Sequence, residues 1–419
     1  ASEHEEYDAI SQELRLLTNY DSPVNFMLGA YYQHTKLDFI NSSKILALGV
    51  DPATGKYETW DKPGSTKGNT YSAFGQIILD ITSQLELAAG VRYTREKKNS
   101  TLANSYVHPP FSGVLFAAPS RIFRDRFRDS NYSPEATLTW RPSADVTTYV
   151  AYKTGYKSGG FGLGFTLTPA NVSEDAARYE AERVKGFEAG VKTQLLDRRL
   201  LLTGAVYTYK YKNLQVNSFD SATTSFVLSN AAAARVKGVE IEAQWKASEW
   251  LRLYGAVAYN HARYLEFVTG CWNGQTAATG CNVPLAPGRF GQDLGGEPLS
   301  RAPDWSMSTG FSVDAPISDR LVFGLAGHAR YSDEYFGVEN GNPAGVQDSF
   351  WVFDASVRVA TADEKLELAL IGRNLGNERY SGGYLAEKPG ATATPGTPVQ
   401  IMGTPARERQ FMLQATFRY

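Results

Sequence analysis

The chain has 419 residues, and its 42 basic and 44 acidic side chains give a formal net charge of -2. This near-neutral balance argues against a nucleic-acid-binding protein, which normally carries a basic excess. The mean hydropathy is -0.32, and no stretch approaches the roughly 18 consecutive apolar residues of a membrane-spanning helix, which excludes a helical membrane protein. It does not exclude a membrane barrel, because barrel strands need only about ten residues of alternating polarity.

The first residues and the two cysteines indicate whether the chain carries a signal peptide and in which kind of compartment it folds. The opening segment ASEHEEYDAI has no basic region followed by an apolar stretch, so we expect no signal peptide in it; either the chain is a mature form or its front is missing. Cys271 and Cys281 have no third Cys or His nearby, so a zinc site has little support. We expect a local disulfide formed in an oxidising compartment rather than two unrelated thiols.

Apolar and polar residues alternate with a period of two along most of the chain, and no long window shows the stripe of an amphipathic helix. Val239 and Ile241, for example, alternate with Glu240 and Glu242, and the segment 411–419 follows the same rule. One face of each such segment is apolar and the other is polar or small. The pattern predicts antiparallel β-strands with two different faces.

Two all-β architectures fit this alternation. A soluble sandwich turns its apolar faces inward, whereas an outer-membrane barrel turns them toward lipid and keeps a polar lumen. Many of the segments exceed ten residues, against the usual five or six in soluble sheets. Aromatic residues such as Trp140 and Trp245 gather near the segment ends, as an interfacial girdle requires. These features favour a transmembrane antiparallel β-barrel.

The predicted elements, in chain order, are strands joined alternately by tight turns and long loops, which is the asymmetry of a bacterial outer-membrane barrel. The strands are expected at residues 11–19, 23–39, 67–81, 84–98, 126–141, 145–157, 181–196, 199–216, 227–246, 250–265, 300–314, 320–331, 349–360, 365–380 and 405–419. The long loops are expected at 40–67, 99–125, 158–179, 217–226, 266–299, 332–348 and 381–404.

The strand count is about fifteen, within fourteen to sixteen, whereas bacterial single-chain barrels have an even number. The segment 11–19 runs into a tight turn, so its start would lie on the extracellular side. A complete barrel begins in the periplasm. We therefore expect residues 1–419 to form a single transmembrane β-barrel domain that is incomplete on its N-terminal side.

Several stretches resemble the barrel of TonB-dependent outer-membrane receptors. They are NYSPEATLTWRPSADVTTYVAYKTGYKSGGF (131–161), VKGFEAGVKTQLLDRRLLLTGAVYTYKYKNLQV (184–216), SNAAAARVKGVEIEAQWKASEWLRLYGAVAYN (229–260), LSRAPDWSMSTGFSV (299–313), GRNLGNERY (372–380) and the aromatic C-terminal strand. Each stretch alone is moderately specific, and their order and spacing together are strong. The resemblance runs from about residue 12 to the end of the chain.

The resemblance implies a 22-stranded barrel filled by an N-terminal plug domain with a TonB box ahead of it. Neither is recognisable here, so the plug and about seven strands are expected to be missing from this chain. The implied function is active import of a scarce nutrient, such as a siderophore, cobalamin or a glycan, across the outer membrane of a Gram-negative bacterium. The implied partners are TonB, contacted through the missing plug, the plug or a complementary chain, a small nutrient ligand, and outer-membrane lipid with lipopolysaccharide.

The alternative function is a passive porin-like pore or a plug-free binding barrel. An enzyme is not expected, because no GxSxG motif is present and the five histidines are scattered. The glycine-rich run 159–164 follows an amphipathic strand and opens no helix, so we interpret it as a flexible loop rather than a phosphate-binding one. No metal, no cofactor and no nucleic-acid partner is expected.

The candidate ligand-binding residues lie in the long loops, where we expect their side chains to be exposed. Aromatic and Arg side chains suit recognition because they bury much area with few rotors. Alternation places three arginines on one face at the top of a strand, which suits an anionic ligand such as a ferric siderophore or lipopolysaccharide phosphates; Asp125 and Asp129 between them weaken the idea. The candidates are Arg124, Arg126, Arg128, Phe161, Phe165, Trp272, Tyr335, Phe336 and Tyr384.

Overall fold

The structure is a computed structural model of the whole chain. It describes residues 2–44, 49–114, 116–119, 121–169, 177–220, 225–286, 288–387 and 394–419. Among these residues, no helix is long and apolar enough to cross a membrane. The three helices described are single 3₁₀ turns, η2 (Pro109–Phe111), η4 (Ala277–Thr279) and η5 (Pro343–Gly345).

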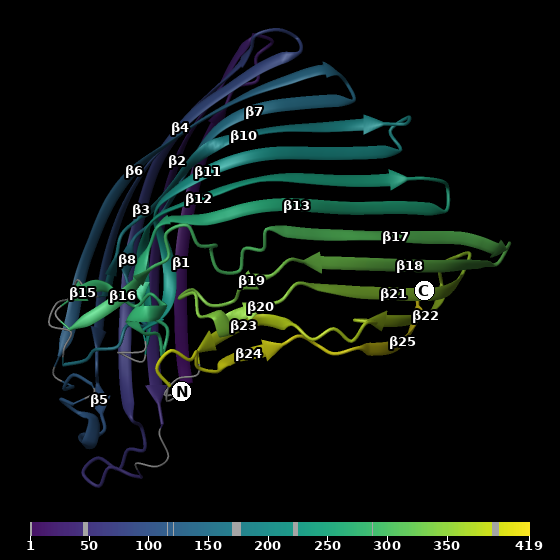
Figure 1. Cartoon of the computed structure of the whole chain (residues 1–419). Coiled ribbons are helices and arrows are strands. Elements are labelled where there is room, and N and C mark those ends of the chain that lie inside the picture. The colour runs from purple at the N-terminus through teal and green to yellow at the C-terminus, as the bar shows by residue number, and fades with distance from the viewer. Residues whose placement is uncertain are drawn as a thin grey trace.

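The architecture is one large antiparallel sheet with small hairpins in its loops (Figure 1). The path of the sheet contains β1 (Ser2–Leu17), β2 (Val24–Ser43), β3 (Trp60–Asp80), β4 (Leu85–Ala103), β6 (Ile122–Ser143), β7 (Val146–Lys157), β10 (Glu182–Leu195), β11 (Leu200–Asp220), β12 (Ser225–Lys246), β13 (Leu251–Glu266), β17 (Trp305–Ser318), β18 (Leu321–Ser332), β21 (Phe350–Thr361), β22 (Leu366–Arg373) and β25 (Gln410–Phe417). The loop strands are β5 (Tyr106–Val107), β8 (Gly160–Phe161), β9 (Arg178–Tyr179), β14 (Val268–Gly270), β15 (Val283–Ala286), β16 (Arg289–Asp293), β19 (Tyr335–Phe336), β20 (Val346–Gln347), β23 (Ser381–Glu387) and β24 (Ile401–Pro405).

Every neighbour in the path is also the next long strand in the sequence, so the sheet is an up-and-down meander. This confirms the all-β fold and the fifteen predicted strands. Sequence reasoning placed several ends wrongly: β1 begins at Ser2 rather than residue 11, and β22 ends at Arg373 rather than 380. It also missed the short strands in the loops, because two to seven residues are too few for a period to show.

The two faces of the sheet differ in composition. The inner face is the one against which the segment 158–169 packs, through Leu102 of β4 and Phe123 of β6. The outer face carries large apolar side chains that stay exposed in the isolated chain, among them Val91, Leu138 and Val150. A continuous exposed apolar surface of this kind is typical of a sheet that contacts lipid.

Aromatic rings mark the outer face near the loop end of the strands. Neighbouring strands contribute them in contact pairs, with ring centroids 4.8 Å apart for Tyr93 and Tyr132 and 4.9 Å apart for Tyr259 and Trp305. The Tyr132 side chain remains 70% exposed. Such a row is the interfacial girdle expected where hydrocarbon gives way to headgroups.

The sheet curls strongly, with β1 at one edge and β25 at the other (Figure 1). In the described part of the chain each of these two strands has a single long neighbour, β2 for β1 and β22 for β25. One row of backbone N–H and C=O groups on each edge strand therefore points away from the sheet.

Candidate functional site

The segment 158–169 folds into the lumen and packs on the inner wall of the sheet. Its Phe161, Leu163, Phe165 and Leu167 form a buried cluster with Leu102 and Phe123 of the wall, together with Ala117 and Ala177, and Leu37 and Phe39 of β2 pack against it. The sequence predicted a flexible glycine-rich loop here. The structure shows a packed one, because alternate apolar side chains of the segment all meet the wall.

Two lysines of the wall hold the backbone of this segment. Lys62 of β3, which is buried, donates from Nζ to the carbonyl oxygens of Gly164 at 2.8 Å and Phe165 at 2.9 Å. Lys98 of β4 donates to Ser158 Oγ at 2.7 Å and to Gly159 O at 2.9 Å. These bonds satisfy carbonyls that would otherwise lose their water on burial.

Gly159 is required where the segment enters the lumen. A Cβ at this position would lie 2.5 Å from the carbonyl oxygen of Tyr179 and 2.7 Å from the ring of Phe127. Any larger residue would push the segment off the wall. The glycines of the run thus serve close packing at this point.

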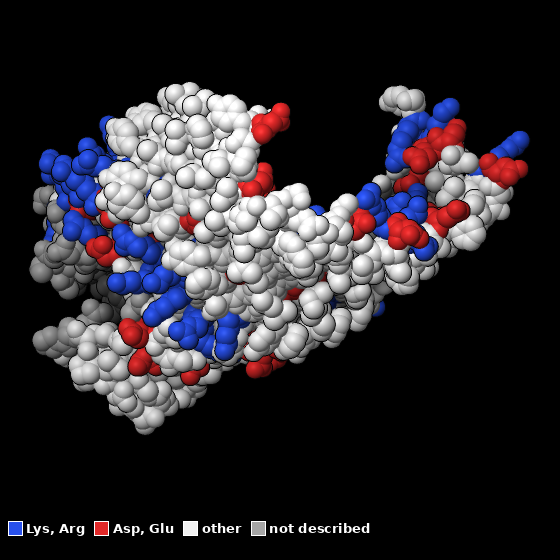
Figure 2. All heavy atoms as spheres, turned by 90° about the horizontal axis from the view of Figure 1, so that it is seen from above, with Lys and Arg blue, Asp and Glu red and all other residues white. Residues whose placement is uncertain are grey.

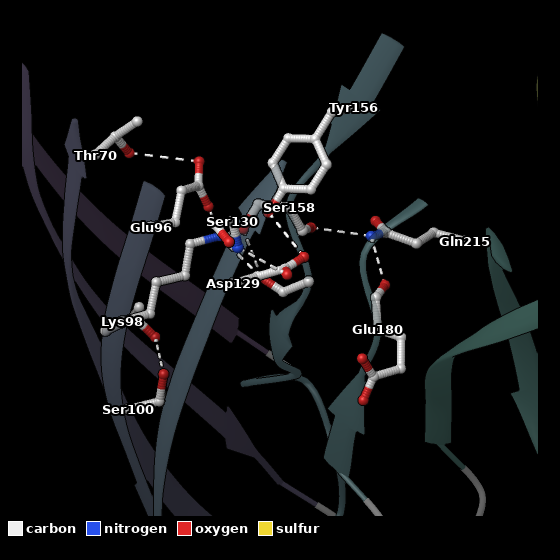
Figure 3. Close-up of polar contacts among 12 residues, drawn as sticks. Thr70, Glu96, Lys98, Ser100, Asp129, Ser130, Tyr156, Ser158, Glu180 and Gln215 are labelled. Carbon is white, nitrogen blue, oxygen red and sulfur yellow. Dashed lines mark hydrogen bonds and ion pairs between the residues drawn. The ribbon is translucent and has the colours of Figure 1, made fainter. Parts of the chain in front are cut away.

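Carboxylates surround this entrance, as Figure 3 shows. Glu96 faces Lys98 with an oxygen–nitrogen distance of 3.6 Å. Asp129 of β6 accepts hydrogen bonds from the Tyr156 hydroxyl at 3.2 Å and from Arg183 at 2.9 Å. Gln215 of β11 donates a hydrogen bond to the carbonyl oxygen of Ser158 at 2.9 Å, so this strand also holds the segment (Figure 3). Lys98 of β4 and Gln215 of β11 therefore fix the start of the segment, and Asp129 of β6 binds side chains beside it.

A cavity of about 640 Å³ lies between this segment and the wall of β1 to β4. Its lining mixes acidic, basic and aromatic side chains, including Glu5, Tyr7, Glu96, Lys98 and Phe161. This volume is in the range that holds small-molecule ligands.

A second cluster joins three of the long loops around the carboxylate of Glu387, which is 3% exposed. Its Oε1 accepts hydrogen bonds from the side chains of Asn340 at 3.0 Å and Asn342 at 2.7 Å. The backbone N–H of Asn273, in the loop with the two cysteines, donates to it at 3.3 Å. One buried carboxylate thus connects residues that lie more than a hundred positions apart in the sequence.

A cavity of about 520 Å³ lies beside this cluster, lined by Trp272, Gln292, Phe336 and Glu339 among others. Burial raises the pKa of the Glu339 carboxyl above its ordinary value, while the charge of Arg301 opposes the shift. A carboxyl with a shifted pKa that faces a cavity of this size marks a candidate binding site.

Seven of the nine candidate residues from the sequence lie in three places. Arg124, Arg126 and Arg128 lie on the outer face of β6, on the side opposite Phe123. Phe161 and Phe165 lie in the lumen cluster, and Trp272 and Phe336 line the second cavity. Tyr335 is half-buried at the start of β19, and the side chain of Tyr384 lies outside the described residues.

The expected exposure of the loop aromatics is wrong for three of them. Phe161, Phe165 and Trp272 are 5%, 6% and 6% exposed. They are buried because the loops pack on the wall and on one another instead of extending into solvent. Sequence reasoning also missed Lys62, Lys98 and Glu387, whose contacts join distant segments and leave no local signal.

The predicted disulfide is confirmed, since Cys271 and Cys281 are bonded to each other. Replacing both with serine is expected to destabilise the closed loop by about 3 kcal/mol, because the open loop of about ten residues gains chain entropy. Hydrogen exchange of residues 268–286 measures the effect, with residues 305–318 of the distant β17 as an internal control. Unchanged exchange in 268–286 would show that packing, not the disulfide, orders this loop.

Comparisons with known proteins agree with this architecture. The family model described as TonB dependent receptor-like, beta-barrel, matches residues 4–375. The chain is 25% identical over 236 residues to the pesticin receptor of Yersinia pestis, a match that covers 56% of this chain and 31% of that protein. It is 27% identical over 288 residues to the ferrichrome outer membrane transporter/phage receptor of Escherichia coli, which covers 67% of this chain and 32% of that protein.

Solved structures show the same fold. The ferric yersiniabactin uptake receptor of Yersinia pestis superposes with a TM-score of 0.73 at 15% identity, covering 99% of this chain and 54% of that one. The siderophore receptor PiuA of Acinetobacter baumannii gives a TM-score of 0.67 at 17% identity, covering 100% of this chain and 56% of that one. The chain thus spans about half the length of these structures. It belongs to the β-barrel family of TonB-dependent receptors, which reside in the outer membrane of Gram-negative bacteria.

Proposed function

We propose that this protein imports a metal chelate across the outer membrane. The observation that carries the proposal is the 520 Å³ cavity among the loops, where Trp272 and Phe336 lie beside the half-buried Glu339. Aromatic walls with a few polar groups suit a compact organic chelate. Support comes from the relatives, which are named for ferrichrome transport and ferric yersiniabactin uptake.

We further propose that additional strands complete the wall. Hydrocarbon offers no hydrogen-bond partners, so the free edges of β1 and β25 must be covered for the sheet to be stable in a membrane. A plug domain would then fill the lumen, and TonB would act on that plug to release the ligand. The lumen cluster at 158–169 lies on the wall that such a plug would face.

Uptake of iron-55 chelates by cells with and without this gene tests the proposal. Import by an energised receptor is saturable, requires the gene and stops without TonB. A passive pore, which is the alternative, would admit solutes in proportion to their concentration whether or not TonB is present.

A further inference from the structure

The cavity of about 520 Å³ among the loops has an acidic wall. Three carboxylates line it: Asp293 at the end of β16, Glu297 in the turn after that strand, and Glu339 between β19 and η5. Lys, Arg and His are absent from the described residues of the lining. Basic side chains are not scarce in this half of the molecule, since Figure 2 shows Lys and Arg gathered on the outside over the loop half. The acidic lining is therefore a local property of the cavity.

Two of these carboxylates have no counter-ion in the described part of the chain. Asp293 accepts a hydrogen bond from the backbone N–H of Gly295 at 2.8 Å. Glu297 and Glu339 form no ion pair with any described residue. The charge of Arg301 acts on Glu339, but this arginine is exposed and lies outside the lining. Burial raises the pKa of the Glu339 carboxyl, so its ionised form would gain from a cation placed in the cavity.

The neutral polar side chains of the wall are already used within the protein. The Gln292 amide donates to the carbonyl oxygens of Gly270 at 3.0 Å and Asn340 at 2.7 Å. Its Oε1 accepts a hydrogen bond from the Gln275 amide at 3.0 Å. The Gln275 Oε1 in turn accepts from the backbone N–H of Trp272 at 3.1 Å. Both amides hold the wall in place, which leaves the carboxylates as the groups that select a ligand.

Aromatic rings favour the same kind of ligand. Tyr264, Trp272 and Phe336 line the cavity, and Trp272 is only 6% exposed. The face of an aromatic ring attracts a cation, most strongly where water is excluded. The indole N–H of Trp272 has no hydrogen-bond partner within the described ranges, so it can donate to an oxygen atom of the ligand. A fitting ligand thus combines a positive charge with acceptor oxygens.

We propose that this cavity selects a metal chelate that carries a cationic group, an ammonium or a guanidinium, beside its metal-binding oxygens. This inference rests on the proposed function and names the charge class of the ligand. The cationic group would lie between Glu297, Glu339 and the aromatic rings, and the apolar part of the chelate would contact Leu294 and Val338. An anionic chelate would meet carboxylates of its own sign, which lowers its affinity.

Three forms of one iron(III) trihydroxamate chelate test the proposal. They differ in the terminal group, which is a free ammonium, an acetylated amine or a succinylated amine, so the charge falls from positive through zero to negative. Binding of each form to the whole protein in detergent micelles is measured by isothermal titration calorimetry. The ammonium form is expected to bind about tenfold more tightly than the acetylated form, and the succinylated form more weakly still. Added salt should weaken binding of the ammonium form and leave the acetylated form unchanged.

One variant and its matched control locate the charge that is recognised. E339Q removes a carboxylate charge with little change in size, and it should lower the preference for the ammonium form about fivefold. Its affinity for the acetylated form should not change, which shows that the cavity has kept its shape. The control, E334Q, removes an exposed carboxylate just before β19 and outside the cavity lining, and it should retain the full preference.

The charge series uses the unaltered protein, so the test does not depend on the folding of a variant. Equal or tighter binding of the acetylated or succinylated form would overturn the inference and leave the import of chelates intact. A full preference in E339Q, or an equal loss in E334Q, would also overturn it. So would binding of none of the three forms, and the iron-55 uptake assay then decides separately whether the protein imports chelates.

Discussion

Replacing Glu387 with alanine is expected to separate the three loops that form the second cavity and to abolish ligand binding there. Asn340, Asn342 and the backbone of Asn273 would lose their common acceptor inside a buried cluster. Each buried donor left unsatisfied costs roughly 1–3 kcal/mol, so the loop cluster should lose about 3 kcal/mol or more. Hydrogen exchange of residues 271–282 and 337–346 measures this loss.

Two further variants test whether the Glu387 carboxylate itself holds the loops together. Glu387→Gln keeps the size and one acceptor oxygen, so it should recover part of the protection. Glu364→Ala removes an exposed carboxylate whose partner is Arg418 in a short turn, and it should leave the loops unchanged. Loops that stay protected in the alanine variant would show that the carboxylate does not hold them together.

Replacing Lys62 with methionine is expected to release the segment 158–169 from the inner wall. Methionine keeps the length of the side chain but cannot donate to the carbonyl oxygens of Gly164 and Phe165. A loss of about 2 kcal/mol in this buried site corresponds to roughly thirtyfold faster hydrogen exchange in 158–169. Hydrogen exchange in the strands of the sheet that do not contact this segment should change little in the same variant.

Lys192→Met is the matched control for Lys62, because Lys192 is an exposed lysine of β10 on the inner face. It should leave exchange in 158–169 unaltered. If Lys62→Met behaves as this control does, the apolar cluster alone fixes the segment, and the two lysine bonds contribute little.

The fold was predictable because successive residues of a membrane strand face lipid and the lumen in turn, so apolar and polar residues alternate along the sequence. Val239 and Ile241 face outward and Glu240 and Glu242 inward, so a period of two is visible without any knowledge of distant contacts. The strand ends were less predictable. Beyond the girdle both faces of a strand meet water, as at Ser2–Glu6 of β1, and the alternation that marks a strand fades.

The site was predictable only in part, because its side chains meet through loop packing. Sequence alone indicated that Trp272 and Phe336 belong to a recognition surface, and both line the same cavity. Phe161 and Phe165 are also aromatic residues in a predicted long loop, yet they pack on the inner wall of the sheet. The partner of Glu387 at Asn273 lies 114 positions away, and a contact at that distance has no period or motif.

The most direct test of the transport proposal is TonB-dependent uptake in intact cells. Iron-55 complexes of phenolate, hydroxamate and catecholate chelators are supplied to cells that carry the gene, lack it, or carry it without TonB. The proposal predicts saturable uptake of at least one complex that requires both the gene and TonB and stops when a protonophore collapses the inner-membrane gradient. Uptake that persists without TonB, or that is the same with and without the gene for every complex, would contradict it.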